Sequence, residues 1–155
     1  MSRWSVALGL LLSLLALPVS AEIRGAVRGG VFKGAADDAV GTIELDAGNG
    51  SWSFAPAFDL IRGGYGLHAV HADIRRLFRS DRNTFWIGGG PTFVNSNAPS
   101  SDRTWNVDAG VAWRINSAWQ PFVAARYYRF HMPIFRDVIE GNGAVLSIGI
   151  SRRIY

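Results

Sequence analysis

The sequence predicts an all-β fold: an eight-stranded antiparallel up-and-down transmembrane β-barrel, preceded by a cleavable signal peptide. Three observations carry this prediction. Apolar and polar residues alternate along eight segments, which is the period of strands with two unlike faces. Glycine and aromatic residues are abundant, with 18 glycines, 9 phenylalanines and 6 tryptophans in 155 residues, as in barrels and sandwiches. Tight turns join some segments and longer connectors join others.

Residues 1–21 have the features of a secretory signal peptide. Arg3 gives a short basic start, an apolar run follows from Val6 to Leu17, and small residues precede Glu22. The alternative is a membrane-anchor helix, but the run is shorter than the roughly 20 residues that such a helix needs. We expect cleavage after Ala21 and one barrel domain over residues 22–155.

The first four segments each have an apolar face opposite a polar one. Their apolar residues are Ile23, Val27 and Val31 in Glu22–Lys33; Ile43 and Leu45 in Asp38–Ala47; Trp52, Phe54, Phe58 and Leu60 in Ser51–Ile61; and Val70, Ala72 and Ile74 in Tyr65–Arg79. The fourth segment contains helix-forming residues in HADIRRLF. Its length matches that of its neighbours, which favours a strand.

The last four segments repeat the pattern. Their apolar residues are Phe85, Ile87 and Phe93 in Asn83–Val94; Trp105, Val107, Val111 and Trp113 in Arg103–Ile115; Trp119, Val123 and Tyr127 in Ser117–Phe130; and Leu146, Ile148 and Ile150 in Gly143–Tyr155. The sixth segment is the clearest, because its other face is small, polar and charged throughout.

The connectors differ in length between the two ends of the predicted strands. Residues 48–50 (GNG), 80–82 (SDR) and 116–117 (NS) are rich in turn formers and predict tight turns. Residues 95–102 and 131–142 are predicted as long loops. Short turns at one end and longer loops at the other are typical of outer-membrane barrels. An even strand count then places both termini on the periplasmic side.

The polar face carries charges of both signs, which suit the interior of a narrow barrel better than a lipid-facing exterior. Only a closed barrel satisfies its strand backbone in hydrocarbon. Eight strands leave an interior just filled by side chains, so we expect a salt-bridged core and not a pore. The predicted lumen charge network comprises Arg24, Arg28, Glu44, Asp46, His71, Asp73, Arg75, Asp108, Arg114 and Arg126.

Aromatic residues on the apolar face, several of them near strand ends, predict the girdles found at membrane interfaces. These residues are Trp52, Phe54, Phe85, Phe93, Trp105, Trp113, Trp119 and Tyr127. The alternative is a soluble periplasmic barrel or sandwich, whose apolar face would point inward around a ligand. Such a protein shares the alternation and the signal peptide.

Composition limits the remaining chemistry. The chain has no cysteine, which excludes a disulfide framework and a cysteine metal site. Its net charge of +4 fits anionic lipid head groups better than nucleic acid, because the chain is exported. His71 and Asp73 share a face and allow a weak metal site. We prefer a lumen hydrogen-bond network in which Arg75 pairs with Asp73, and we expect no metal and no cofactor.

The whole layout over residues 22–155 resembles the small eight-stranded outer-membrane barrels, the OmpA/OmpX-like class. Members of this class end in a strand that closes on an aromatic residue, which the barrel assembly machinery reads, and Tyr155 fits that position. The chain departs from the pattern in one respect. The residues in step with Tyr155, including Ser151 and Arg153, are not apolar, and the apolar register is that of Ile148 and Ile150.

The last quarter of the chain is also similar in outline to the lipid A deacylases, which are barrels of this size. That resemblance implies a triad in which a histidine on the seventh strand activates a serine two residues later. His131 and Glu140 are the candidate histidine and acid, but residue 133 is proline and the serine nucleophile is missing.

The favoured interpretation is a non-enzymatic integral outer-membrane barrel, a monomer that serves envelope structure or surface interaction through residues 95–102 and 131–142. Its expected partners are outer-membrane lipid, lipopolysaccharide and the assembly machinery, with no nucleic acid. Two alternatives stay open: a lipid A deacylase-like esterase of the outer membrane, and a soluble periplasmic ligand-binding barrel.

Overall fold

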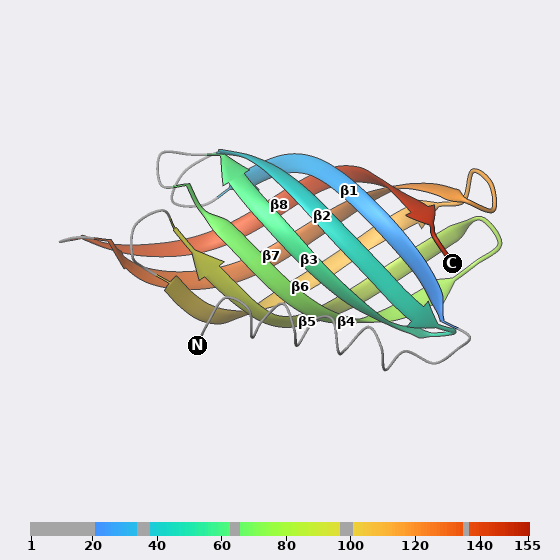
Figure 1. Ribbon diagram of the computed structural model, residues 1–155, viewed down its shortest axis with the longest axis horizontal. Helices are drawn as coiled ribbons and strands as arrows, with labels where there is room; N and C mark the ends of the chain where they lie inside the picture. The colour runs from blue at the N-terminus through green and yellow to red at the C-terminus, as the bar shows by residue number, and fades with distance from the viewer. Residues whose placement is uncertain (1–20, 34–37, 63–65, 97–100, 135–136) are drawn as a thin grey trace.

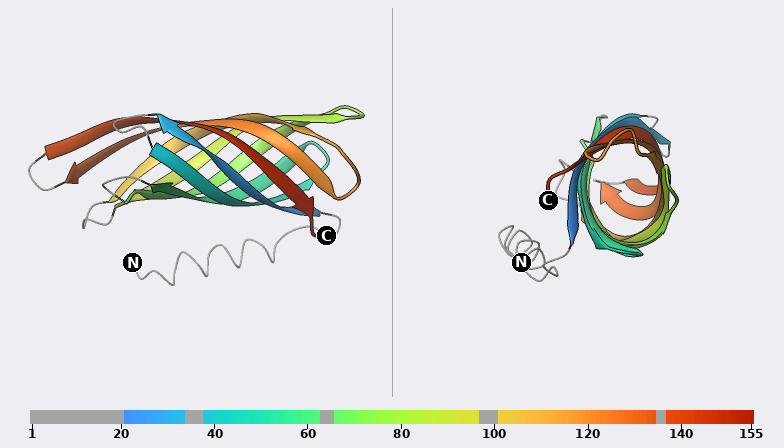
Figure 2. Two further views of the ribbon diagram at one scale, coloured as in Figure 1. Left: turned by 90° about the horizontal axis from the view of Figure 1, so that it is seen from above. Right: turned by 90° about the vertical axis from the view of Figure 1, so that its right-hand side faces the viewer.

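Eight antiparallel strands close into a single barrel in which each strand pairs with the next and β8 pairs with β1 (Figures 1 and 2). The computed structural model describes residues 21–33, 38–62, 66–96, 101–134 and 137–155, without the side chains of residues 130–142. The predicted signal peptide, except Ala21, and residues 97–100 of the predicted loop at 95–102 lie outside these residues, while Asn95 ends β5 and residues 101–102 begin β6. The strands are β1 (Glu22–Lys33), β2 (Asp38–Asn49), β3 (Trp52–Arg62), β4 (His68–Arg79), β5 (Asn83–Asn95), β6 (Ser101–Trp113), β7 (Trp119–Ile134) and β8 (Asp137–Arg153).

All eight predicted strands are confirmed. The predicted bounds of β1 match the observed ones, and β4 is a strand throughout HADIRRLF. Local helix propensity is therefore overridden by pairing with β3 and β5, which satisfies the backbone of β4 on both sides. Among the described residues, no helix is long and apolar enough to cross a membrane.

The predicted loop at residues 131–142 is wrong, because the described residues of this segment continue β7 and β8 as a paired ribbon. Pairing between the two strands runs from Trp119↔Arg152 to Ile134↔Asp137. The pairing of β7 with β6 ends at Tyr128, and that of β8 with β1 ends at Ala144. We call the two-stranded part beyond these points, residues 129–134 and 137–143, the β7–β8 extension.

Pro133 is compatible with the β7–β8 extension. Proline cannot donate a ladder hydrogen bond, and it is found on edge strands, at the first residue of a strand or at bulges. In the β7–β8 extension β7 has one paired edge, and Figure 1 shows the ribbon projecting from the end of the barrel.

The two ends of the barrel differ. One end carries the turns between β2 and β3, β4 and β5, and β6 and β7, together with the start of β1 and the C-terminus; we call it the turn end (Figure 1). Gly50 turns the chain there with φ of +67°, a conformation that favours glycine. Asn116 closes another turn, since its Oδ1 accepts from the backbone N–H groups of Ala118 and Trp119 at 2.9 and 2.8 Å. The opposite end is the loop end.

Apolar side chains point outward and charged side chains point inward. Trp105 and Ile148 are 74% and 69% exposed, whereas Asp73 and Asp108 are fully buried. A barrel in water would show the reverse arrangement, because water solvates charges and excludes apolar surface. Each strand pairs with a neighbour on both sides, so the ladder is closed around the barrel, as hydrocarbon requires.

The interior is layered along the barrel axis. A loop-end apolar cluster contains Phe32, Val40, Ile61, Leu67, Ala69, Val94, Tyr128 and Val145. A turn-end apolar cluster contains Ala26, Leu77, Trp86, Ala112, Phe122 and Ala124. Between them, on the same inward faces of the strands, lie the buried charged residues.

Candidate functional site

Arg75 of β4 is the hub of the buried charged layer. Its guanidinium donates to both carboxylate oxygens of Glu44, with Nη1–Oε1 at 2.6 Å and Nη2–Oε2 at 2.9 Å. Its Nε donates to Oδ1 of Asp108 at 2.7 Å, and Nη1 reaches Asp46 at 3.3 Å. The ring of Trp86 covers the guanidinium at 5.3 Å and donates its N–H to Asp108 at 2.6 Å. Bidentate, charge-assisted bonds of this kind are the strongest that side chains make.

Arg126 of β7 forms a second centre toward the loop end. Its Nη2 donates to Oδ2 of Asp73 at 2.7 Å, and its Nη1 contacts both oxygens of Asp59 at 3.3 and 3.4 Å. The guanidinium also lies 3.6 Å from Glu44 and 3.7 Å from Asp108. Arg126 therefore connects the two groups of carboxylates across the lumen.

His71 ties the network to the wall of the barrel. Its two ring nitrogens lie 2.9 Å from the hydroxyl of Thr92 and 3.0 Å from a carboxylate oxygen of Asp59. Asn106 donates to Asp73 at 2.6 Å and to Thr92 at 3.0 Å. Both His71 and Asp73 are thus engaged in a hydrogen-bond network, the arrangement that we preferred over a metal site.

Arg28 of β1 completes the layer with weaker contacts. Its guanidinium lies 3.5 Å from Glu44 and 3.6 Å from Asp108, within ion-pair distance. Among the described residues it has no side-chain partner at hydrogen-bond geometry. Arg28 neutralises the same two carboxylates as Arg75 without fixing their orientation.

The structure brings seven of the ten predicted lumen residues into this buried layer: Arg28, Glu44, His71, Asp73, Arg75, Asp108 and Arg126. Asp46 lies at its edge, with a side chain 24% exposed. Arg24 and Arg114 lie outside it, at the mouth of the turn end, where Arg24 pairs with Glu22 at 2.5 Å and Arg114 is exposed.

The expected pair of Arg75 with Asp73 is wrong. Asp73 and Arg75 are residues i and i+2 of one strand, so their side chains extend side by side from the same face and their charged groups do not face each other. Arg75 instead reaches strands β2 and β6, and Asp73 pairs with Arg126 of β7.

Five further residues belong to the interior but were absent from the predicted network: Asp59, Trp86, Thr92, Asn106 and Tyr128. Asp59 had a clear signal, because it shares the polar face of its strand with Ser53. Trp86 and Tyr128 had none, since buried aromatic residues on the polar face run against the alternation. Tyr128 is fully buried and stacks on His71 with ring centroids 5.4 Å apart.

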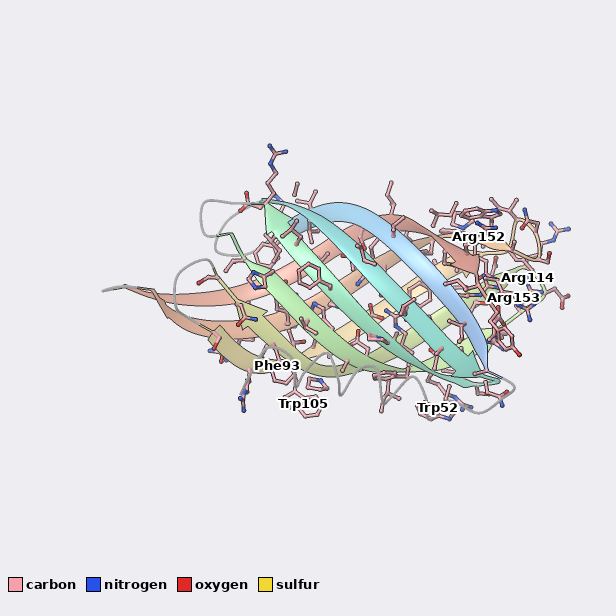
Figure 3. The ribbon with its side chains drawn as sticks, in the orientation of Figure 1. Trp52, Phe93, Trp105, Arg114, Arg152 and Arg153 are labelled. Atoms are coloured by element: carbon pink, nitrogen blue, oxygen red, sulfur yellow. The ribbon has the colours of Figure 1, made fainter. Side chains whose placement is uncertain are left out.

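The predicted girdle residues all lie on the outer face. Trp52, Phe85, Phe93, Trp105, Trp113, Trp119 and Tyr127 are between 39% and 74% exposed, and Phe54 is half-buried. Figure 3 shows Trp105 and Phe93 near one another toward the loop end and Trp52 toward the turn end. They therefore mark two levels along the axis, as girdles do.

His131 and Glu140, the candidate triad residues, are cross-strand partners in the β7–β8 extension. Their side chains lie outside the described part of the structure. Position 133, where the triad places its nucleophile, is paired with Val138 and is proline.

Three layers of side chains follow one another along the lumen: the loop-end apolar cluster, the buried charged layer and the turn-end apolar cluster. A cavity of about 100 Å³ enters from the turn end between Arg24, Arg114 and Gln120 and reaches Arg75 and Glu44. Its described lining lies wholly on the turn-end side of the loop-end apolar cluster. The arrangement pairs buried charges of both signs across the lumen.

Solved structures with the same architecture decide the fold. Neisserial surface protein A has a TM-score of 0.67 and 12% identity over 86% of this chain and 97% of that chain. Ail of Yersinia pestis has a TM-score of 0.58 and 11% identity over 86% and 97%. This chain has the fold of a small outer-membrane β-barrel. The barrel domain of Pseudomonas aeruginosa OprF agrees, with a TM-score of 0.56 and 12% identity over 87% and 100%.

No protein-family model and no curated protein matches the sequence of this outer-membrane barrel. The fold, together with the apolar exterior that this chain's own sequence supplies, is that of a protein embedded in the outer membrane.

Proposed function

We propose that this barrel is a non-enzymatic, non-conducting anchor that holds the β7–β8 extension outside the cell, for envelope structure or surface interaction. The observation that carries the proposal is the layered interior, in which a buried ion-pair layer lies between two apolar clusters. An open pore needs a hydrated path through the lumen from end to end, and in this barrel side chains fill the lumen. The segment at residues 95–102 is the second proposed contact surface.

Conductance tests the closed lumen. The purified barrel is inserted into planar bilayers at several voltages, with a trimeric porin as the positive control. We expect the porin to give discrete current steps and this chain to give none, because ions must cross the buried ion-pair layer and the dehydrated loop-end apolar cluster. Stable steps from the folded chain would contradict a closed anchor and indicate a channel.

Surface labelling tests the orientation. The chain has no cysteine, so each single-cysteine variant reports one position. We expect Asp137→Cys, at the tip of the β7–β8 extension, to react with a membrane-impermeant maleimide on intact cells. Ser117→Cys, in an exposed turn at the opposite end, should react only after the outer membrane is permeabilised. The reverse result would overturn the proposed display of the extension.

The proposed partners follow from the same geometry. The end of the chain supports recognition by the assembly machinery, because the N–H of Ile23 donates to the carbonyl of Tyr155 at 2.9 Å and extends the closing seam of β1 and β8. The apolar outer face supports contact with outer-membrane lipid and lipopolysaccharide. A closed ladder satisfies the wall without a second chain, which supports a monomer.

A lipid A hydrolase is the second candidate, favoured by one observation, the register pair of His131 and Glu140. A histidine held by a carboxylate is part of a triad, but acyl transfer also needs the nucleophile that Pro133 replaces. Mass spectrometry of lipid A from expressing cells separates the two functions, since only a hydrolase changes its acylation.

A further inference from the structure

The basic excess of the chain is concentrated at one end of the barrel. Seven arginines lie at the turn end, where the acidic side chains of the described residues are Glu22, Asp81 and Asp46, which lines the turn-end cavity and pairs with Arg75. The arginines are Arg24, Arg76, Arg79, Arg82, Arg114, Arg152 and Arg153. Arg24 is paired with Glu22, and the others are exposed or half-buried. Figure 3 shows Arg114, Arg152 and Arg153 together at this end.

The loop end has a smaller excess of basic residues among the described side chains. Its basic residues are Lys33, Arg62, Arg103 and Arg129, and its acidic residues are Asp38 and Asp102. The charges also alternate locally, because Asp38 is beside the pairing partner of Arg62, and Asp102 precedes Arg103. The turn end therefore has the larger excess of positive charge, and the loop-end residues Arg62 and Arg103 have acidic neighbours.

Two turn-end arginines point away from the barrel axis and rest on girdle tryptophans. The guanidinium of Arg76 lies 5.1 Å from the ring of Trp52, and that of Arg152 lies 5.3 Å from the ring of Trp119. Tryptophan on an outer face sits at head-group level. An arginine stacked on such a ring keeps its stem on apolar surface and its charge among the head groups.

We propose that the turn end binds the head groups of anionic phospholipids in the periplasmic leaflet, with Arg76 and Arg152 as the two contacts. Phosphate esters accept bidentate hydrogen bonds from guanidinium groups. The other exposed arginines add to the attraction, which falls off within about 10 Å at 0.1 M salt. The two stacked arginines point away from the barrel axis, toward the surrounding bilayer. This direction fits lipid better than peptidoglycan, an acidic polymer that would lie beyond the turn end. This inference rests on the proposed insertion of the barrel in the outer membrane.

Spin-labelled lipids test the proposal on the folded, full barrel in phosphatidylcholine vesicles. The measured quantity is the association constant of labelled phosphatidylglycerol relative to labelled phosphatidylcholine. One arginine near an anionic surface strengthens association on the order of fivefold. We expect a preference of at least this order for the wild type, a value close to one for Arg76→Gln with Arg152→Gln, and a loss of preference in concentrated salt.

The matched control is Arg62→Gln with Arg103→Gln, two exposed arginines at the loop end, of which Arg103 also stacks on an aromatic ring, Phe93, at 5.9 Å. This pair removes the same charge and should keep the preference, since acidic neighbours offset these arginines. Equal losses in the two double variants, or a wild-type preference close to one, would overturn the proposal. Binding of the wild type and of the Arg76→Gln, Arg152→Gln variant to peptidoglycan is measured in parallel. A variant that binds peptidoglycan less well but keeps the lipid preference would also overturn the proposal.

Folding is measured independently in vesicles of phosphatidylcholine alone. The measurement is the change in gel mobility on heating, which distinguishes the folded barrel from the unfolded chain. A wild-type chain that inserts but shows no lipid preference contradicts only this inference. A wild-type chain that does not insert contradicts the membrane anchor itself. The wild-type measurement and its salt dependence decide the inference even where the Arg76→Gln, Arg152→Gln variant does not fold.

Discussion

Arg75→Met is expected to lower the free energy of unfolding by about 3–5 kcal/mol, because removing one partner of a buried ion pair leaves the other charges uncompensated. Arg75 is the only cation that hydrogen-bonds Glu44 and Asp108 among the described residues, and it bonds both oxygens of Glu44. Methionine keeps much of the length and volume but supplies no donor. Denaturant titration in vesicles, followed by tryptophan fluorescence, measures the loss.

Arg28→Met is the matched control for charge. It removes the same charge from the same two carboxylates, but its contacts of 3.5 and 3.6 Å are longer than hydrogen bonds. We expect a clearly smaller loss than for Arg75→Met. Similar losses for the two variants would show that net charge in the lumen, and not the hydrogen-bonded hub, stabilises the interior.

Ile148→Arg is expected to destabilise the folded barrel by about 2–4 kcal/mol, the cost of an arginine on the lipid face near the bilayer midplane. Ile148 is 69% exposed and lies in the middle of the part of β8 that pairs with β1. In water the same substitution at so exposed a position would be nearly neutral. The measurement is again unfolding in vesicles.

Ile154→Arg supplies the comparison at the other depth. Ile154 is similarly exposed, at 64%, but lies at the turn end beyond the last residue of β8. Close to the interface the cost of an arginine falls to about 0–1 kcal/mol. Equal effects at the two positions would mean that water, and not hydrocarbon, covers Ile148.

The two faces of each strand could be predicted from the sequence because side chains in a strand alternate with a period of two. Ile148 and Ile150 point outward, and Ser147 and Ser151 point inward, as their positions in the sequence indicate. The same parity places Asp59 in the lumen. Once one residue of a strand is known to point inward, the alternation fixes the direction of the others. The two faces of a strand therefore depend only on its own sequence.

The partners within the lumen could not be predicted in this way. Arg75 lies on β4 and its carboxylates lie on β2 and β6, so the pairing depends on how far each strand is shifted along its neighbours. That shear is a property of the closed barrel. The β7–β8 extension was missed for a related reason, because the alternation within one strand does not show how far two strands stay paired beyond their other neighbours.

The arginine–carboxylate contacts of the interior also impose an order of events on assembly. Arg75 and Asp108 are 33 residues apart in the chain, and Arg126 and Asp59 are 67 apart. Neither contact can form until strands distant in sequence have met, which is the slow step for topologies built from nonlocal pairs. Before that moment the same charges need water around them, so the inner wall stays hydrated until these strands have met. Drying of the interior and completion of the fold are then one cooperative event.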